Sequence, residues 1–338
     1  MRHTISTVPS LLRPGNSDRH VLSQLQSQWP YNAEPSPALS ALGCFAIVYR
    51  NIFRHLPRTQ RLETDVFGLG KLFEGVERRL WEYLWLDMNP NGAEAVKAFR
   101  IETQKLVDEL IDVFLLDDGF TFKRLTEGHR VLGNLWNHDC LNLYQTGACY
   151  KYTIGGDTWS DWEKVPSHTA SRIPGIIKCN GCGNLVDQIN APFVIRYHPR
   201  AFTPERVKDS CAMPAVIPVL LKTAPNQEPI PNVFEAVGQF ELCDWDTRAG
   251  APEDDRPLAT IKGRYQLMAV VRLRKTADEL DMVRVYSWSK KCVVPDHKTF
   301  FYPAQWGISE PGREYMLYYS KVEDWSISPW AEEVRISW

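Results

Sequence analysis

The stretch RYQLMAVVRLR, residues 264–274, carries the clearest structural signal in this chain. Its aromatic, β-branched and other apolar residues form one run with basic residues at both ends, a texture that predicts a long β-strand. Residues 282–287 and 314–320 have the same texture and predict two further strands. Shorter runs of the same kind predict strands at 150–154, 192–197 and 216–221. The chain after about residue 140 is therefore predicted to be mainly sheet.

The first third of the chain has a helical pattern instead. Apolar residues recur at intervals of three and four over 39–56, 64–88 and 93–116, each typical of a helix with one buried face. Asp117-Asp118-Gly119 ends the third helix. Helices followed by strands predict an α+β fold with an antiparallel sheet.

Composition excludes several classes of protein. The 338 residues include 39 Lys+Arg and 41 Asp+Glu, so the net charge of -2 gives no general attraction to nucleic acid or to an acidic membrane. The longest apolar runs, 45–49 and 215–221, are far shorter than the ~20 residues that span a bilayer. No secretory signal is visible, so we expect an intracellular protein, cytoplasmic or nuclear. Residues 1–37 are rich in Pro, Ser and Gln and predict a flexible arm.

Cysteines give the most specific local motif. Cys179 and Cys182, separated by Asn-Gly, have the spacing of a zinc knuckle, in which two thiolates point at one ion. Structural zinc needs two more ligands, and Cys140 and Cys149 are the upstream candidates, with His138 as a substitute for either. The alternative is that these cysteines are merely reduced or buried. The upstream pair, Cys140 and Cys149, lacks the two-residue spacing of a zinc knuckle.

The remaining motifs give little indication of a catalytic or binding site. The histidines form no metal or triad spacing, and Gly68–Lys71 lies within a helical pattern, which disfavours a nucleotide loop. Arg272, Arg274 and Lys275 end a strand and are expected to form a solvated edge. Trp residues are numerous, and those considered as partner anchors are Trp136, Trp159, Trp162, Trp306 and the C-terminal Trp325, Trp330 and Trp338, although large rings more often fill a core.

The order of these segments resembles the ubiquitin-specific protease family. LSALGCF at 39–45 is similar to the family's Leu-x-Asn-Leu-Gly-Asn-Thr-Cys box, and residues 100–112 keep the apolar positions of its Gln-Gln-Asp-Ala helix. Residues 191–202 resemble the strand that ends in Arg-Phe in the family. The best matches are 265–271, similar to the Tyr-x-Leu-x-Ala-Val-Val strand, and 313–319, similar to the closing strand.

The resemblance implies a papain-like cysteine protease fold with a helical thumb, zinc-ribbon-like fingers and an antiparallel β palm. It assigns 38–338 to one such domain after the arm 1–37: a thumb at 38–135, fingers and the first palm strands at 136–245, and the palm sheet with a C-terminal tail at 246–338. Structural Zn²⁺ is the implied cofactor, and proteins, ubiquitin among them, are the implied partners.

The catalytic positions of the family are degenerate here. Cys44 fills the nucleophile position only with a gap in the alignment, and Ala46 stands there without one. The oxyanion-stabilising Asn falls on Ala41, and the catalytic His falls on Met282, whose thioether accepts no proton. The third partner falls near 301–305, which has no carboxylate. The resemblance therefore implies an inactive member of the family.

Three hypotheses follow for function. The first is a catalytically inactive protein of this fold that serves as a protein-binding or scaffold subunit. The second is an active cysteine deubiquitinase in which Cys44 pairs with an unaligned histidine such as His297. The third is an unrelated zinc-binding α+β protein, which would be favoured if the Cys179 pair bound metal while the strands around Tyr265 and Tyr315 were not neighbours in one sheet.

Overall fold

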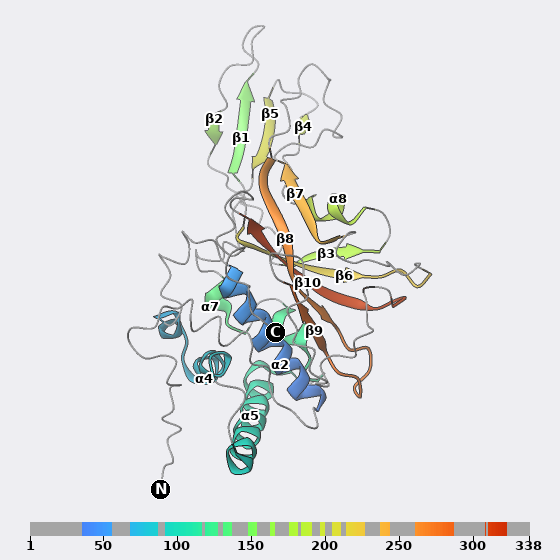
Figure 1. The fold of residues 1–338 in the computed structure, drawn as a ribbon. Helices are drawn as coiled ribbons and strands as arrows, with labels where there is room; N and C mark the ends of the chain where they lie inside the picture. The colour runs from blue at the N-terminus through green and yellow to red at the C-terminus, as the bar shows by residue number, and fades with distance from the viewer. Residues whose placement is uncertain are drawn as a thin grey trace, which may run out of the picture.

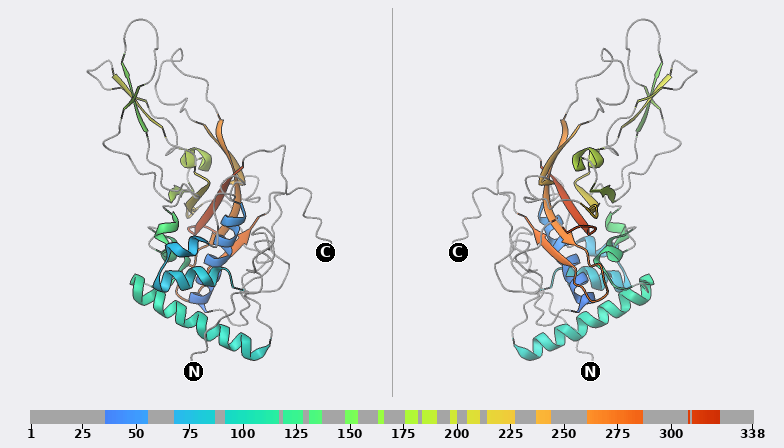
Figure 2. Two further views of the ribbon diagram at one scale, coloured as in Figure 1. Left: turned by 90° about the vertical axis from the view of Figure 1, so that its left-hand side faces the viewer. Right: turned by 90° about the vertical axis from the view of Figure 1, so that its right-hand side faces the viewer.

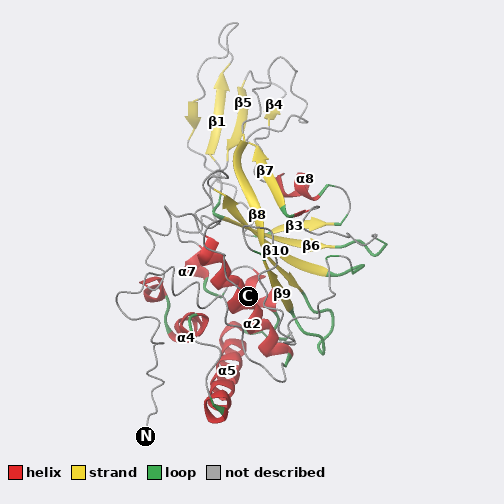
Figure 3. Cartoon of the chain, in the orientation of Figure 1, coloured by secondary structure: helices red, strands yellow, loops and turns green. Residues whose placement is uncertain are grey.

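The computed structural model shows a mixed α/β protein in which the helices other than α8 gather at one end and the described strands form two sheets (Figures 1 and 3). Within the part of the chain that the structure describes, no helix is both long and apolar enough to cross a bilayer. The described residues are 36–55, 68–86, 92–116, 119–127, 131–136, 148–153, 163–165, 176–181, 184–190, 197–199, 205–210, 214–226, 237–243, 261–286, 308 and 310–322.

Helix α2, Pro37–His55, lies at the centre of the helical part. It begins at the last residue assigned to the arm, and it confirms the first predicted helix. The expectation of one buried face is wrong, because every residue from Ser40 to Phe53 is buried. The cause is that α2 packs against strands on one side and against other helices on the other.

Two buried polar residues of α2 donate hydrogen bonds to backbone carbonyls. Arg50 donates through Nε to the carbonyl of Leu84 and through Nη2 to that of Leu86 (2.6 Å), carbonyls at the end of a neighbouring helix. Asn51 donates through Nδ2 to the carbonyl of Met268, 2.7 Å away. Because a buried polar group without a partner costs free energy, these bonds allow α2 to sit inside the protein.

The second predicted helix, 64–88, is divided in the structure. A short 3-10 helix, η2, spans Gly68–Leu72, and α4 spans Gly75–Leu84 with Glu74 extended before it. The third predicted helix is confirmed as α5, Ala93–Phe114, which runs across the end of the helical part (Figure 2). The short helices α6, Phe122–Thr126, and α7, Gly133–Trp136, follow.

The larger sheet has the strand order β3-β6-β10-β8-β7, with β9 paired to one end of β8. β8 and β10 are antiparallel neighbours, with Lys321 opposite Tyr265 and Tyr315 opposite Arg272, so the strands around Tyr265 and Tyr315 share one sheet. β3 pairs with β6 in parallel, which corrects the expectation of a purely antiparallel sheet. The strands are β3 Ile177–Asn180, β6 Val216–Lys222, β7 Gln239–Cys243, β8 Ile261–Arg272, β9 Met282–Val285 and β10 Glu314–Val322.

A second, four-stranded sheet lies at the end of the molecule opposite the helices (Figures 1 and 2). Its order is β2-β1-β5-β4, and all its pairs are antiparallel. β1 matches the strand predicted at 150–154, whereas the strand predicted at 192–197 falls outside the described residues except for Tyr197. The strands are β1 Ala148–Thr153, β2 Glu163–Val165, β4 Tyr197–Pro199 and β5 Glu205–Ser210. Helix α8, Leu185–Asn190, lies between the strands of the two sheets in the chain.

A β-bulge at Met268 lets β8 contribute side chains to two apolar clusters. Tyr318 lies opposite Ala269 and Tyr319 opposite Leu267, so Met268 is the extra residue. Before the bulge, Tyr265 and Leu267 belong to a cluster with β3 and α8; after it, Ala269 and Val271 belong to the cluster around α2. Because side chains alternate along a strand, the extra residue shifts the alternation by one. Odd-numbered residues therefore face one cluster before the bulge and the other cluster after it.

Position 70 requires a glycine, because the Trp81 ring leaves no room for a side chain there. A Cβ at position 70 would lie 2.9 Å from Cδ1 and Nε1 of the buried Trp81 indole. We expect Gly70→Ala to lower the free energy of unfolding by about 1–3 kcal/mol, the usual cost of overpacking. Gly133→Ala is the matched control, because nothing lies within 4 Å of a Cβ there. Urea unfolding of both variants checks this, and equal stabilities would contradict it.

Candidate functional site

The candidate site lies where the first half of α2 meets the start of β9. The backbone N–H of Asp281 donates to Oγ of Ser40 at 3.1 Å, and the Ser40 hydroxyl donates to the carbonyl of Pro37 at 2.7 Å. The resemblance aligns segment 39–45 with the nucleophile box of the protease family and segment 280–286 with its histidine box. The fold therefore brings these two segments, about 240 residues apart in the chain, into contact.

Cys44 is buried at this contact. Its side chain has no exposed surface, and it is a free thiol. Burial raises the pKa of the Cys44 thiol well above its ordinary value, and the charge of nearby Asp281 raises it further. A nucleophilic cysteine needs a lowered pKa and access to its substrate, and Cys44 has neither. Ala41 and Ala46, the alternative family positions, are also fully buried on α2.

The charge of Asp281 acts on this thiol, and both side-chain oxygens of Asp281 already accept hydrogen bonds. Oδ2 accepts from the backbone N–H of Phe122 at 3.1 Å, and Oδ1 accepts from that of Arg274 at 3.0 Å. Burial raises the pKa of Asp281, although the two hydrogen bonds and the charge of Arg274 oppose the shift. Asp281 thus joins α2, the first turn of α6 and the end of β8, and acts as a structural junction.

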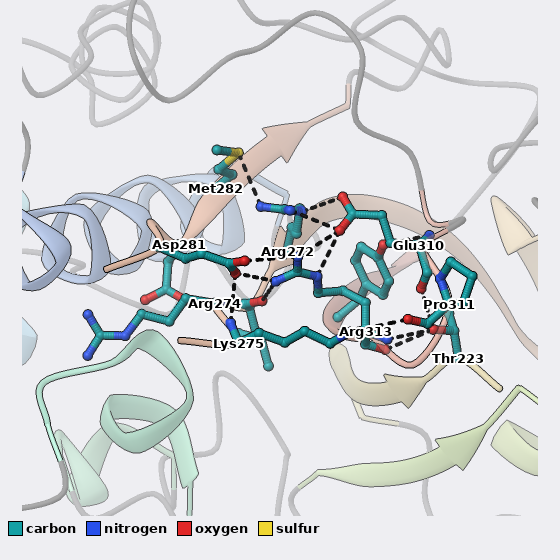
Figure 4. Close-up of polar contacts among 12 residues, drawn as sticks. Thr223, Arg272, Arg274, Lys275, Asp281, Met282, Glu310, Pro311 and Arg313 are labelled. Carbon is teal, nitrogen blue, oxygen red and sulfur yellow. Dashed lines mark hydrogen bonds and ion pairs between the residues drawn. The ribbon is translucent and has the colours of Figure 1, made fainter. Parts of the chain in front are cut away.

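Met282 stands where the resemblance places the histidine. Its side chain is half-buried, and its Sδ is 3.8 Å from Nη1 of Arg272, which donates to it (Figure 4). A thioether is a weak acceptor and cannot take up a proton at ordinary pH. Position 282 therefore has no general base.

Arg272 belongs to a network of ion pairs that sequence reasoning missed. Its guanidinium bonds both oxygens of Glu310, at 2.6 and 2.9 Å. Arg313 pairs with Glu310 at 2.8 Å (Figure 4). It also pairs with Glu279. The side chains of Arg272 and Arg313 are 13% and 6% exposed, so the expectation of a solvated strand end is wrong for Arg272. Arg274 is half-buried and Lys275 is exposed.

The network holds two carboxylates in their charged form. The hydrogen bond from Arg313 is the main cause that lowers the pKa of Glu279 to about 2. Burial alone would raise the pKa of Glu310, but Arg272 and Arg313 together outweigh it and lower that pKa. Arg272 lies 38 positions from Glu310 and Arg313 lies 34 positions from Glu279, so no local pattern points to these two pairs.

The proposed zinc ligands are only partly within the described residues. Cys179 lies on β3, and its buried side chain belongs to the apolar cluster with β7 and α8. Cys149 lies on β1 in the other sheet, and Cys140 and Cys182 lie outside the described residues. Among the residues that the structure describes, no three His, Cys, Asp or Glu side chains gather at one point. The four-cysteine zinc site stays a prediction, which metal analysis of the purified protein would test.

Several further candidates also fall outside what the structure describes. They are His138, Trp159, Trp162, His297, residues 301–305, Trp306, Trp325, Trp330 and Trp338. Trp136 is the last residue of α7, and only its backbone is described.

Comparison with known proteins gives similarities among solved structures. No protein-family model and no curated protein matches the chain. The chain is similar to the Saccharomyces cerevisiae Pan2 pseudoubiquitin hydrolase–RNA exonuclease module in complex with AAGGA RNA, at 12% identity over 92% of this chain, with a TM-score of 0.40; it spans only 57% of that module. It is similar to the S. cerevisiae Pan2 pseudoubiquitin-hydrolase at 13% identity over 92% of each chain, with a TM-score of 0.38. The SAGA DUB module with Ubp8 and Sgf11 matches at 10% identity over 90% of this chain and 63% of that chain, with a TM-score of 0.28.

Asp281→Asn tests the structural junction. An asparagine of the same shape accepts through one atom only, so either Phe122 N–H or Arg274 N–H would lose its partner. We expect the free energy of unfolding to fall by about 1–3 kcal/mol. Asp278→Asn, at an exposed position of the same turn, is the control and should leave stability unchanged in urea unfolding. Equal losses in the two variants would argue against the junction.

Glu279→Gln tests the ion-pair network through pH. Because the folded pKa of Glu279 is about 2 and the ordinary value is 4.5, its contribution to stability is complete above about pH 4.5 and is lost as pH falls toward 2. The stability difference between wild type and Glu279→Gln should therefore be largest near about pH 7 and shrink by about pH 3 in denaturant titrations. A pH-independent difference would contradict the assignment. Glu127→Gln, at an exposed position, serves as control.

Proposed function

We propose that this chain is a catalytically inactive protein with a ubiquitin-specific-protease-like fold, which acts as a protein-binding or scaffold subunit. Ubiquitin is the first partner to test, because the protein family that the sequence resembles acts on it. The observation that carries the proposal is the contact between α2 and β9. The two segments that would supply a nucleophile and a base meet there, and neither supplies one.

Chemistry at this contact argues against a protease. Thiol proteolysis needs a reachable thiolate, a base beside it and a donor for the oxyanion. Cys44 is buried and its thiol pKa is raised, the thioether of Met282 is not a base, and Ala41 has no side-chain donor. Asp281 keeps both oxygens on backbone N–H groups. An activity based on Cys44 would first have to expose a side chain packed in the core.

Topology supports this fold over an unrelated zinc protein. The strand with the Tyr-x-Leu-x-Ala-Val-Val pattern and the closing strand pair over eight residue positions. Helices precede the sheet, and the segment 39–45 lies beside the strand that begins at Met282. These are the neighbours that the family resemblance requires.

A ubiquitin that carries a C-terminal thiol-reactive group tests the proposal, together with a binding titration of unmodified ubiquitin. We expect no covalent adduct with wild type, and none with Met282→His, because an added imidazole leaves Cys44 buried. Cys44 should be alkylated only in denaturant, as mass spectrometry of the peptide that contains it would show.

Each outcome decides one part of the proposal. An adduct that disappears in Cys44→Ser would establish a cysteine deubiquitinase and overturn the inactive assignment. Binding of ubiquitin without an adduct would support a ubiquitin-binding scaffold. Absence of both would keep the protein inactive but would reject ubiquitin as its partner.

A further inference from the structure

Among the strands that the structure describes, β3 ends the order of the larger sheet, and its backbone groups alternate between two directions. The N–H of Gly181 donates to the carbonyl of Lys222 at 2.7 Å, so the odd-numbered residues of this segment face β6. By the two-residue period of a strand, Lys178 and Asn180 turn their N–H and C=O groups away from the sheet. Such a row of outward groups is a template for another strand.

Gln188 of α8 occupies this template at Asn180. The Asn180 N–H donates to Oε1 of Gln188 at 2.9 Å, and Nε2 of Gln188 donates to the Asn180 carbonyl at 3.1 Å. A single carboxamide thus makes the donor and acceptor pair that a neighbouring strand would make. Both bonds lie at the surface.

Helix α8 holds Gln188 in this place. α8 contacts both β3 and β7, the two outer strands in the order of the sheet, and it lies beside both in Figure 1. Ile189 is buried at 1% exposure in the apolar cluster shared with β3 and β7. Asn184 begins the helix by accepting from the N–H of Val186 at 2.9 Å. The buried side chain of Ile189 and the carboxamide of Gln188 therefore hold the six-residue helix α8 against the sheet.

We infer that Gln188 is an edge cap, which stops β3 of one molecule from pairing with β3 of a second copy. Two copies of the same edge can pair antiparallel about a twofold axis, since each offers the same donors and acceptors. In the native protein the Asn180 groups needed for that pairing are bonded to Gln188. Release of the carboxamide frees them.

The test compares Gln188→Ala with wild type by sedimentation velocity over a wide concentration range and by hydrogen exchange of residues 177–181. We expect Gln188→Ala to self-associate as concentration rises, whereas wild type stays monomeric. At low concentration the Asn180 amide should exchange about tenfold faster or more than in wild type. Gln104→Ala is the matched control: this exposed glutamine donates to Asp108 on α5, far from β3 in sequence.

Gln188→Ala/Lys178→Pro separates edge pairing from general aggregation. Proline removes the N–H of Lys178, which points away from β6, so the native sheet keeps its hydrogen bonds while the edge loses a donor. We expect this variant to be monomeric again. Self-association that persists in it, or a Gln188→Ala protein that stays monomeric at all concentrations, would overturn the inference. Circular dichroism of each variant checks that the fold is retained.

Discussion

The buried helix α2 constrains everything else in this fold. A helix enclosed on all sides is shielded from water, so its polar groups depend on partners inside the protein. Ser40 accepts from the backbone of Asp281, Arg50 donates to the end of α4, and Asn51 donates to the bulge of β8. These three contacts hold the larger sheet, its bulge and helix α4 against α2.

The same constraint removes the chemistry from the candidate site. Enclosing α2 also encloses Cys44, and the desolvation that stabilises the core keeps its thiol protonated. Asp281 could have acted on a neighbour, but it instead holds the N–H groups of Phe122 and Arg274. The Cys44 thiol and the Asp281 carboxylate could serve either reactivity or stability. In this protein both groups serve stability.

Sequence patterns predicted the elements whose periodicity is strong. α2, α5, β6, β8, β9 and β10 were all visible as local repeats of apolar residues. The division between η2 and α4 was not, because the apolar spacing continues through the break. The contact between Ser40 and Asp281 joins segments about 240 residues apart, and no local pattern contains it.

Long-range features stayed hidden for physical reasons. The ion pairs of Arg272 and Arg313 depend on which segments the fold brings together, and charge at the end of a strand looks the same in sequence whether it is solvated or paired. The bulge at Met268 left no signature either, since methionine fits a regular strand as well. Gln188 gave no sign of its role, because a carboxamide in a short helix is ordinary in sequence.

That bulge sets the register of β8 against β10 on both sides of Met268. If β8 paired with β10 without a bulge, every residue on one side of Met268 would change faces. Ala269 and Val271, which belong to the cluster around α2, would then face the aromatic cluster of Phe240 and Tyr319. Deletion of Met268, in contrast, would leave Leu267 and Ala269 opposite Tyr319 and Tyr318, so both would keep their faces. Met268 is therefore the position at which this strand can lose a residue without turning its apolar side chains away from the helix.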